Sequence, residues 1–310
     1  MIVRSKFIQL ITLSALVVVA TVIAACSSEE EATIEKAEAS GKLVSSDWML
    51  ENLDNEDVVV VDLRKEEDYA AGHIPGAIQL TPKAVFQQED ENGVAGMLPA
   101  AAHIATALSE LGIEPSDTVV FYDSNSNLWA SRALWAMDVY GHSDSKLIDG
   151  SWNYWSANEL KTSTDVPEIT ASNYAFTAAP DLSIIAGWEE VLESVDDPSS
   201  IVCDARSPEE FSGKDVRAAA GGHIPESSNV NWNRSVNEQG EFLPAAELRV
   251  IYEGEGIQGD KVVFTLCQTA VRATHSWFVL QELLGYETVK VYDGSWTEWG
   301  NRTDVPITTR

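Results

Sequence analysis

The chain has 310 residues, of which 45% are hydrophobic and 22% charged, so it is long enough for two globular domains with hydrophobic cores. It carries 20 Lys and Arg against 49 Asp and Glu, a formal net charge of -29. This charge excludes a nucleic-acid-binding protein, which needs a basic face, and a folded domain held on anionic lipid by its own charge. The three cysteines and five histidines are scattered, so we expect no disulfide scaffold, no metal site and no cofactor.

The N-terminus has the pattern of an export signal. Arg4 and Lys6 precede an apolar run over residues 7–25, which ends in two alanines. A basic head, an apolar run and small residues before a cleavage point are typical of a secretory signal. The Cys that follows, Cys26, resembles the lipidated Cys of the bacterial lipoprotein box. The alternative is a transmembrane anchor, since about 20 apolar residues can span a bilayer.

We therefore expect residues 1–25 to be a signal peptide and Cys26 to carry a lipid, the only link to the membrane. Residues 26–41 are mostly Ser, Glu, Ala and Gly and predict a solvated acidic tether. The folded part then lies in the cell envelope, facing the periplasm or the exterior.

The rest of the sequence contains several short motifs twice, in the same order. The pairs are Val58–Arg64 with Ile201–Arg206, Gly72–Pro75 with Gly222–Pro225, Val119–Phe121 with Val262–Phe264, and Asp149–Trp152 with Asp293–Trp296. The offset of 142 to 150 residues has the size of a globular domain. The repeat predicts two homologous domains, at about 42–167 and 181–307.

Each copy alternates expected strands with expected helices. Short, continuous, β-branched runs predict buried strands at 58–61, 119–122, 146–148, 201–203, 262–266 and 288–292. Apolar residues at helical spacing predict helices over Ala100–Leu111 and Arg272–Leu284, each ending before a Gly. This order indicates α/β domains, each a parallel sheet with helices on both faces, whose active sites lie at the carboxyl ends of strands.

Cys267 is the candidate nucleophile of the second copy. It follows an expected strand and precedes a helix, so unpaired N–H groups of the helix N-terminus point towards it. The helix dipole and the nearby Arg272 favour thiolate over thiol. The alternative for a lone Cys is a buried structural residue, which is our interpretation of Cys203 inside its strand.

A Gly-His-Ile-Pro loop, then Cys-x-x-x-x-Arg, then Asp-Gly-Ser-Trp resembles the rhodanese family of sulfurtransferases, over about residues 42–306. The two copies look like the two-domain thiosulfate or 3-mercaptopyruvate sulfurtransferases, in which the C-terminal copy is active. The resemblance implies that Cys267 takes a sulfane sulfur from a small anionic donor as a persulfide and passes it to cyanide or a thiol. Counting by an offset of 143 places Ser124 opposite Cys267, so we expect an inactive first domain.

The resemblance also implies roles for the residues near Cys267. Arg272 would act in catalysis by adding positive charge, and the loop N–H groups would hold the anionic persulfide. The loop residues expected to bind substrate are Gln268, Thr269, Ala270 and Val271. Arg206 either meets the substrate or pairs with Asp204 or Glu210.

Two residues depart from the family pattern. Ala270 stands where the family usually has Gly, which costs about 1 kcal/mol if the position needs a positive φ. Glu210 stands where many two-domain members have Arg, and its charge would repel an anionic donor if it faced the cleft. These departures keep a second class of function open, a non-catalytic envelope module that binds a sulfur carrier or partner protein.

Loop length separates sulfur chemistry from phosphate chemistry. The Cys-dependent phosphatase relatives have five residues between Cys and Arg, whereas four lie between Cys267 and Arg272. The shorter loop disfavours a tetrahedral phosphate.

Histidines and tryptophans recur in both copies, including the copy without a Cys. We therefore expect His73 and His223 to fasten loops, and Trp296 to be packed, with the cleft as its alternative. His275 is expected on a face of the helix after the active loop.

Overall fold

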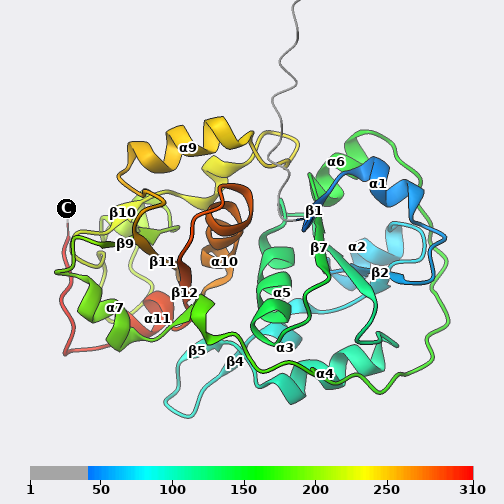
Figure 1. Cartoon of the computed structure of the whole chain (residues 1–310), viewed down its shortest axis with the longest axis horizontal. Helices are drawn as coiled ribbons and strands as arrows, with labels where there is room; N and C mark the ends of the chain where they lie inside the picture. Colours follow the sequence, from blue (N-terminus) through cyan, green and yellow to red (C-terminus); the bar gives the residue numbers. More distant parts are fainter. Residues whose placement is uncertain (1–40, 310) are drawn as a thin grey trace, which may run out of the picture. The chain divides into compact units, whose positions relative to one another are not determined.

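The computed structural model describes residues 41–309, which contain two five-stranded sheets (Figure 1). The expected signal peptide, Cys26 with its expected lipid, and all but the last residue of the expected tether lie outside the described residues. Within 41–309, no helix combines the length and the apolar character needed to cross a membrane.

The first domain contains the elements β1 to α6. They are β1 Leu43–Val44, α1 Ser46–Glu51, β2 Val58–Asp62, α2 Glu66–Ala71, β3 Ile78–Gln79, α3 Pro82–Phe86, β4 Gln88–Glu89, β5 Ala95–Met97, α4 Ala101–Glu110, β6 Thr118–Tyr122, α5 Leu128–Val139, β7 Ser145–Ile148 and α6 Ser151–Ala157.

The second domain contains the elements η1 to α11. They are η1 Leu182–Ile184, β8 Ile185–Ala186, α7 Trp188–Ser194, β9 Ser200–Asp204, α8 Pro208–Phe211, β10 Ser228–Asn229, η2 Trp232–Ser235, α9 Ala245–Gly254, β11 Val262–Leu266, α10 Val271–Trp277, the π-helical η3 Phe278–Leu283, β12 Val289–Tyr292 and α11 Ser295–Trp299.

The two sheets have the same topology. The first has the order β1-β7-β6-β2-β3, and the second, read in the same direction, has β8-β12-β11-β9-β10. All pairs within these two sheets are parallel. The predicted α/β fold with two parallel sheets is thus confirmed.

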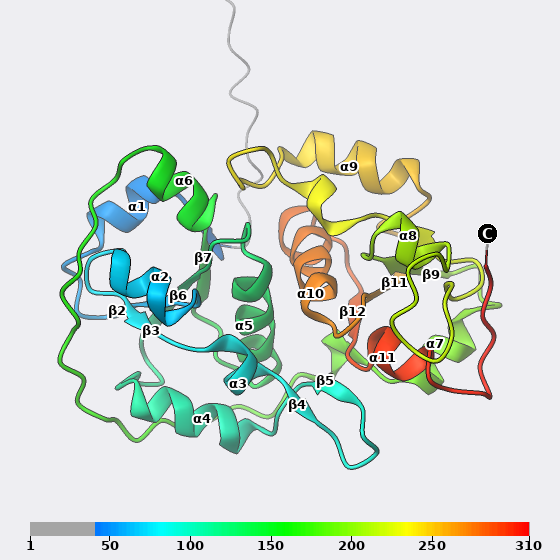
Figure 2. The ribbon, with the colours of Figure 1, turned by 180° about the vertical axis from the view of Figure 1, so that it is seen from behind.

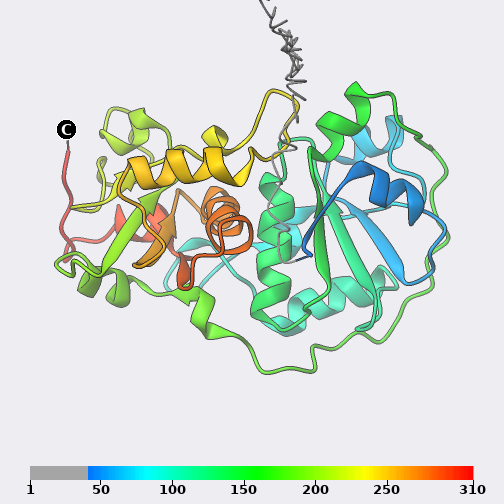
Figure 3. The same cartoon turned by 45° about the horizontal axis from the view of Figure 1, so that its top comes forward.

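Each sheet is covered on both faces because successive residues of its strands point to opposite sides. Val60 belongs to an outer cluster beneath α1 and α6, while Val61 belongs to an inner cluster that includes α4 and α5. In the second domain Val202 faces an outer cluster with α7 and α11, and Cys203 faces the inner one. Figure 3 shows α9 over the inner side of the second sheet.

The inner faces of both domains form one hydrophobic cluster. It passes through α5 and α10, which lie side by side (Figures 1 and 3). The β4–β5 hairpin of the first domain also reaches α11 of the second (Figure 2). Residues of the first domain are therefore close to the loop that follows β11.

The two Asp-Gly-Ser-Trp motifs fasten the domains to each other reciprocally. Asp149 of the first domain accepts a hydrogen bond from the N–H of Phe242 at 2.9 Å. Asp293 of the second accepts one from the N–H of Leu98 at 2.6 Å and pairs with Arg132 at 2.7 Å. Because Arg132 is fully buried, this pair fixes α5 against the second domain.

All six expected strands are present within a residue or two of their predicted limits. The helix expected over Ala100–Leu111 is α4, and the helix expected over Arg272–Leu284 begins at Val271 and turns π-helical from Phe278. The two-residue edge strands β1, β3, β8 and β10 were not predicted, because two residues show no periodicity.

Candidate active site

Cys267 lies at the carboxyl end of the central strand β11, as the sequence predicted. It is 1% exposed, and its N–H donates to Ser295 Oγ at 3.2 Å. Its carbonyl accepts from the N–H of Trp296 at 3.0 Å, so the second Asp-Gly-Ser-Trp motif holds the backbone on both sides of the sulfur. The helix α10 begins four residues later. This position directs the N-terminus of α10 towards the sulfur.

Arg272, in the first turn of α10, is paired with Glu210. Its guanidinium donates to the two carboxylate oxygens of Glu210 at 2.6 and 2.8 Å. Burial lowers the pKa of Arg272, but its interactions with Glu210 and Cys267 outweigh burial and raise it overall. A permanent positive charge therefore lies beside the sulfur, already shared with a carboxylate.

Glu210 is held in place by its own helix. It is 1% exposed and forms a capping box with Ser207 at the start of α8. Burial raises the pKa of Glu210. The interactions with Arg272, then with the Ser207 N–H and Arg217, outweigh burial and lower the pKa to about 2. Glu210 is ionised at neutral pH, and its charge is directed at Arg272. Sequence reasoning missed this pair, whose partners are 62 residues apart.

Among the remaining loop residues, Thr269 contacts the first domain. Gln268 donates its side-chain amide to the Arg217 carbonyl at 3.2 Å, and the Thr269 carbonyl accepts from Gln87 of the first domain at 2.9 Å. Ala270, fully buried, has a φ of 59°, the left-handed conformation in which an Ala is strained. Val271 is the first residue of α10. The structure thus brings all four together with Cys267 and Arg272.

Arg206 has a different environment. It is 1% exposed, binds the Asp204 carboxylate with a shortest distance of 2.6 Å, donates to a backbone carbonyl at 2.8 Å and stacks on Trp296. Arg64 of the first domain makes the same contacts with Asp62 and a Trp. Because the arrangement recurs in the domain without a Cys, the geometry favours the structural alternative, the pair with Asp204.

The residue opposite Cys267 in the first domain is Asp123, so the expectation of Ser124 was wrong. The Asp123 N–H donates to Ser151 Oγ at 2.8 Å, as that of Cys267 does to Ser295. The register of β6 and β11 against β2 and β9 gives the same equivalence. Counting at a constant offset failed because the first-domain loop is one residue longer before its left-handed helix cap.

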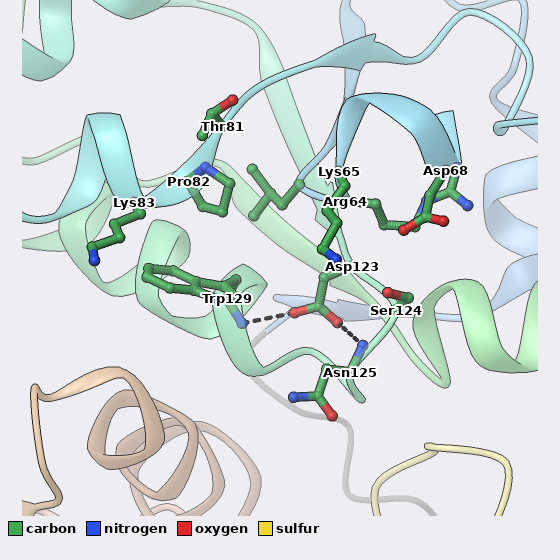
Figure 4. Close-up of a pocket in the computed structure, with 11 residues that line it drawn as sticks. Arg64, Lys65, Asp68, Thr81, Pro82, Lys83, Asp123, Ser124, Asn125 and Trp129 are labelled. Carbon is green, nitrogen blue, oxygen red and sulfur yellow. Dashed lines mark hydrogen bonds between the residues drawn. The ribbon is translucent and has the colours of Figure 1, made fainter. Parts of the chain in front are cut away.

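The Asp123 carboxylate fills the turn of its own loop. Burial raises its pKa, and hydrogen bonds from backbone N–H groups oppose that rise. The donors are the N–H groups of Asn125 at 2.8 Å, Asn127 at 3.0 Å, Trp129 at 2.7 Å and Ala130 at 3.2 Å. Two of these bonds are drawn in Figure 4. A loop of this construction can hold a negative charge on main-chain N–H groups, as an anionic persulfide on Cys267 requires.

Other expected roles can be compared with their contacts. His73 and His223 each donate from Nδ1 to a backbone carbonyl at 2.9 Å and stack on an aromatic ring, so their loop-fastening role is confirmed. Cys203 is fully buried, and burial raises its pKa, as expected of a packed thiol. Trp296 is 1% exposed and packed. Both Cys203 and Cys267 are free thiols.

His275 differs from the expectation of a simple helix-face residue. It is fully buried in α10 at the domain junction, where Nε2 lies 3.2 Å from the Ser126 carbonyl of the first domain. Burial lowers its pKa to about 3. The counterpart of His275 in α5 is Arg132, and both connect one domain to the other.

Within residues 41–309, no group of three or more His, Cys, Asp or Glu side chains is arranged to hold a metal ion. The chemistry of the site described above rests on one thiol, one guanidinium and main-chain donors.

Comparison with known families places this architecture. The family described as "Rhodanese-like domain" matches residues 45–158 and 188–302. The chain therefore belongs to the rhodanese family, with two such domains, one per sheet.

Named relatives support a sulfurtransferase. A protein of Saccharopolyspora erythraea named "Putative thiosulfate sulfurtransferase" is 38% identical over 274 residues, 86% of this chain and 95% of the relative. "Sulfur carrier protein TtuD" of Thermus thermophilus is 38% identical over 279 residues, with coverage of 86% and 95%.

Solved structures with the same fold are also known. The 3-mercaptopyruvate sulfotransferase SseA of Escherichia coli superposes with a TM-score of 0.71 at 29% identity, over 83% of this chain and 99% of that one. The structure of an EanB persulfide superposes with a TM-score of 0.77 at 24% identity, over 88% of this chain and 71% of that one. At this identity the match shows a similar fold alone.

Proposed function

We propose that this protein transfers a sulfane sulfur through a persulfide on Cys267. The observation that carries the proposal is the position of Cys267 at the end of β11, directly before the first turn of α10, which holds Arg272. A thiolate needs a nearby cation and N–H donors to be a good nucleophile at neutral pH, and this loop supplies both.

The reaction has two half-reactions. The Cys267 thiolate attacks the outer sulfur of the donor, so a new S–S bond forms while the bond from that sulfur to the rest of the donor breaks. The remainder leaves with the electron pair, as sulfite from thiosulfate or as the enolate of pyruvate from 3-mercaptopyruvate. Cyanide or a thiolate then attacks the outer persulfide sulfur, and Cys267 leaves as thiolate.

The donor class follows from the charges at the site. An anionic donor such as thiosulfate or 3-mercaptopyruvate approaches Arg272, which already binds Glu210 through both terminal nitrogens. We propose that the donor shares Arg272 with Glu210 and takes its remaining hydrogen bonds from the loop N–H groups. Arg206 is occupied by Asp204 and has no part in this scheme.

Mass spectrometry of the intact protein after exposure to thiosulfate or 3-mercaptopyruvate tests the proposal. The expected result is the gain of one sulfur atom on Cys267, its loss on adding cyanide, and no gain in Cys267→Ser. Cys203→Ser is the matched control, because Cys203 is a buried thiol of the same sheet, and it should gain sulfur normally. No adduct with either donor would refute the sulfurtransferase.

A second candidate is a non-catalytic module that binds a sulfur carrier or partner protein. The 1% exposure of Cys267 and the occupied Arg272 favour it, and one relative is named a sulfur carrier protein. A Cys267 that never becomes persulfidated would support this module. Hydrolysis of an aryl phosphate that depends on Cys267 would instead indicate a phosphatase.

We also propose that the protein is a lipoprotein of the cell envelope, anchored through Cys26. The basis is the basic head, apolar run and Cys of the N-terminal sequence. Cys26→Ala should abolish lipid labelling and release the protein from membranes. Continued anchorage of the unlabelled variant would favour a transmembrane segment.

A further inference from the structure

The first domain has a cavity at the place where the second has Cys267. It encloses about 300 Å³ and is lined from the loop after β2, the start of α3, the loop after β6 and the first turn of α5. These segments meet at the carboxyl ends of parallel strands, where sheets of this class bind ligands. Figure 4 shows the lining residues.

The cavity differs in chemistry from the site of the second domain. The Asp123 carboxylate is turned inward and takes the loop N–H groups, so these donors are not offered to a ligand. The polar residues that line the cavity instead include Ser124, Asn125, Lys83 and Lys65, whose ammonium lies 3.9 Å from the Glu67 carboxylate. Any ligand must therefore be recognised by side chains.

Residues of opposite charge line the two ends of the cavity. Lys83 lies beside the Trp129 indole, whereas Asp68 lies at the opposite end of the cavity (Figure 4). Arg64 also lines the cavity, but its charge is offset by Asp62 at 2.6 Å. The end with Lys83 and Trp129 thus offers a positive charge next to a flat apolar surface.

Comparison with the second domain indicates that the positive charge of this cavity occurs in the first domain only. The offsets of 142 and 150 residues in the flanking motifs place Ser207 opposite Lys65 and Asn233 opposite Lys83. In a chain with only 20 basic residues, both lysines occur where the other copy is neutral.

We propose that this cavity binds a small organic anion with a flat apolar part. Its carboxylate or sulfonate lies at Lys83, and its flat part stacks on Trp129 against Pro82. The volume is within the range of small-molecule sites, and stacking on an aromatic ring next to a cation is a common mode of recognition. This site is separate from Cys267 and does not depend on the proposed sulfur transfer.

Calorimetric titration with naphthoate as the probe tests the proposal, with the neutral naphthamide as the ligand control. Lys83→Gln should weaken naphthoate about fivefold and leave naphthamide unchanged, since only the charge pair is lost. Asp68→Asn should tighten naphthoate about twofold, because it removes a repelling charge. Lys161→Gln, an exposed lysine of the same domain outside the cavity, should have no effect.

The indole N–H resonance of Trp129, assigned by its loss in Trp129→Phe, should shift on addition of naphthoate. Cys267→Ser should bind the probe as the wild type does, which separates this site from the sulfurtransferase. Naphthoate that binds no better than naphthamide, or binding that Lys83→Gln and Lys161→Gln leave equally intact, would overturn the proposal.

Discussion

The loops after β6 and β11 occupy the same place in their sheets, but they hold their negative charge differently. In the first domain the anion is the Asp123 carboxylate, fixed by four main-chain N–H groups, and the outer face of the loop is open to a cavity. In the second the position holds Cys267, the outer face is closed by Arg272 and Glu210, and the sulfur is 1% exposed.

The difference between the two loops indicates why the second domain, and not the first, can be reactive. The turn itself, with its left-handed helix cap, is common to both. The Asp123 carboxyl group, which accepts four main-chain hydrogen bonds, makes the turn a structural unit, whereas a thiol leaves room for an anion that forms and disappears during a reaction. Arg272 is the second requirement, since the first domain has Trp129 at its position. The predictions below test this contrast.

The largest effect is expected from the nucleophile. Cys267→Ser should lower the rate of sulfur transfer from thiosulfate to cyanide about a thousandfold or more, because serine forms no persulfide. Asp123→Asn, at the equivalent position of the first domain, should retain nearly full activity in the same cyanide assay. Comparable losses in both variants would show that the first loop takes part in the reaction.

The Asp123 carboxylate should matter for stability instead. Asp123→Ala leaves four N–H groups without their acceptor and should lower the free energy of unfolding by about 2 kcal/mol, as measured by urea denaturation. Asp123→Asn keeps an acceptor oxygen and should lose less. An Ala variant as stable as the wild type would contradict the view that this carboxylate holds the loop.

The junction between the domains should be sensitive to acid through His275. Its folded pKa of about 3 lies below the usual 6.5, so between these values the unfolded chain binds the extra proton and stability falls as the pH falls. From pH 7 to pH 5 this amounts to about 1 to 2 kcal/mol.

The matched variants are His275→Gln and His103→Gln, since His103 is exposed. His275→Gln should lose less unfolding free energy than the wild type between pH 7 and pH 5, whatever its stability at neutral pH. The second should leave that loss unchanged. Equal pH dependence in all three proteins would show that His275 is not buried as a neutral ring.

The sequence predicts the sheets well because buried β-branched runs and a repeat are local signals. The strand 262–266 and the position of Cys267 at its end were found in this way. The Glu210–Arg272 pair was missed, since nothing in either segment indicates that α8 lies against α10. The equivalence of Asp123 with Cys267 was missed because one extra loop residue shifts the count, and it follows only from the strand register and the hydrogen bonds of the fold. His275 lies in the predicted helix, but its burial was not predicted because the domain junction that covers it is a tertiary feature.

The smallest effect is expected from the residue that closes the reactive loop. Glu210→Gln removes the charge that competes for Arg272 and should lower the KM for thiosulfate about threefold, with a smaller change in kcat. Glu209→Gln, the exposed neighbour of Glu210, controls for a general change of surface charge and should leave KM unchanged. A KM that rises in Glu210→Gln would mean that the carboxylate positions Arg272 for the donor rather than competing with it. The closed face of the second loop would then be part of the binding site, and the contrast with the open loop of the first domain would lie in the cation alone.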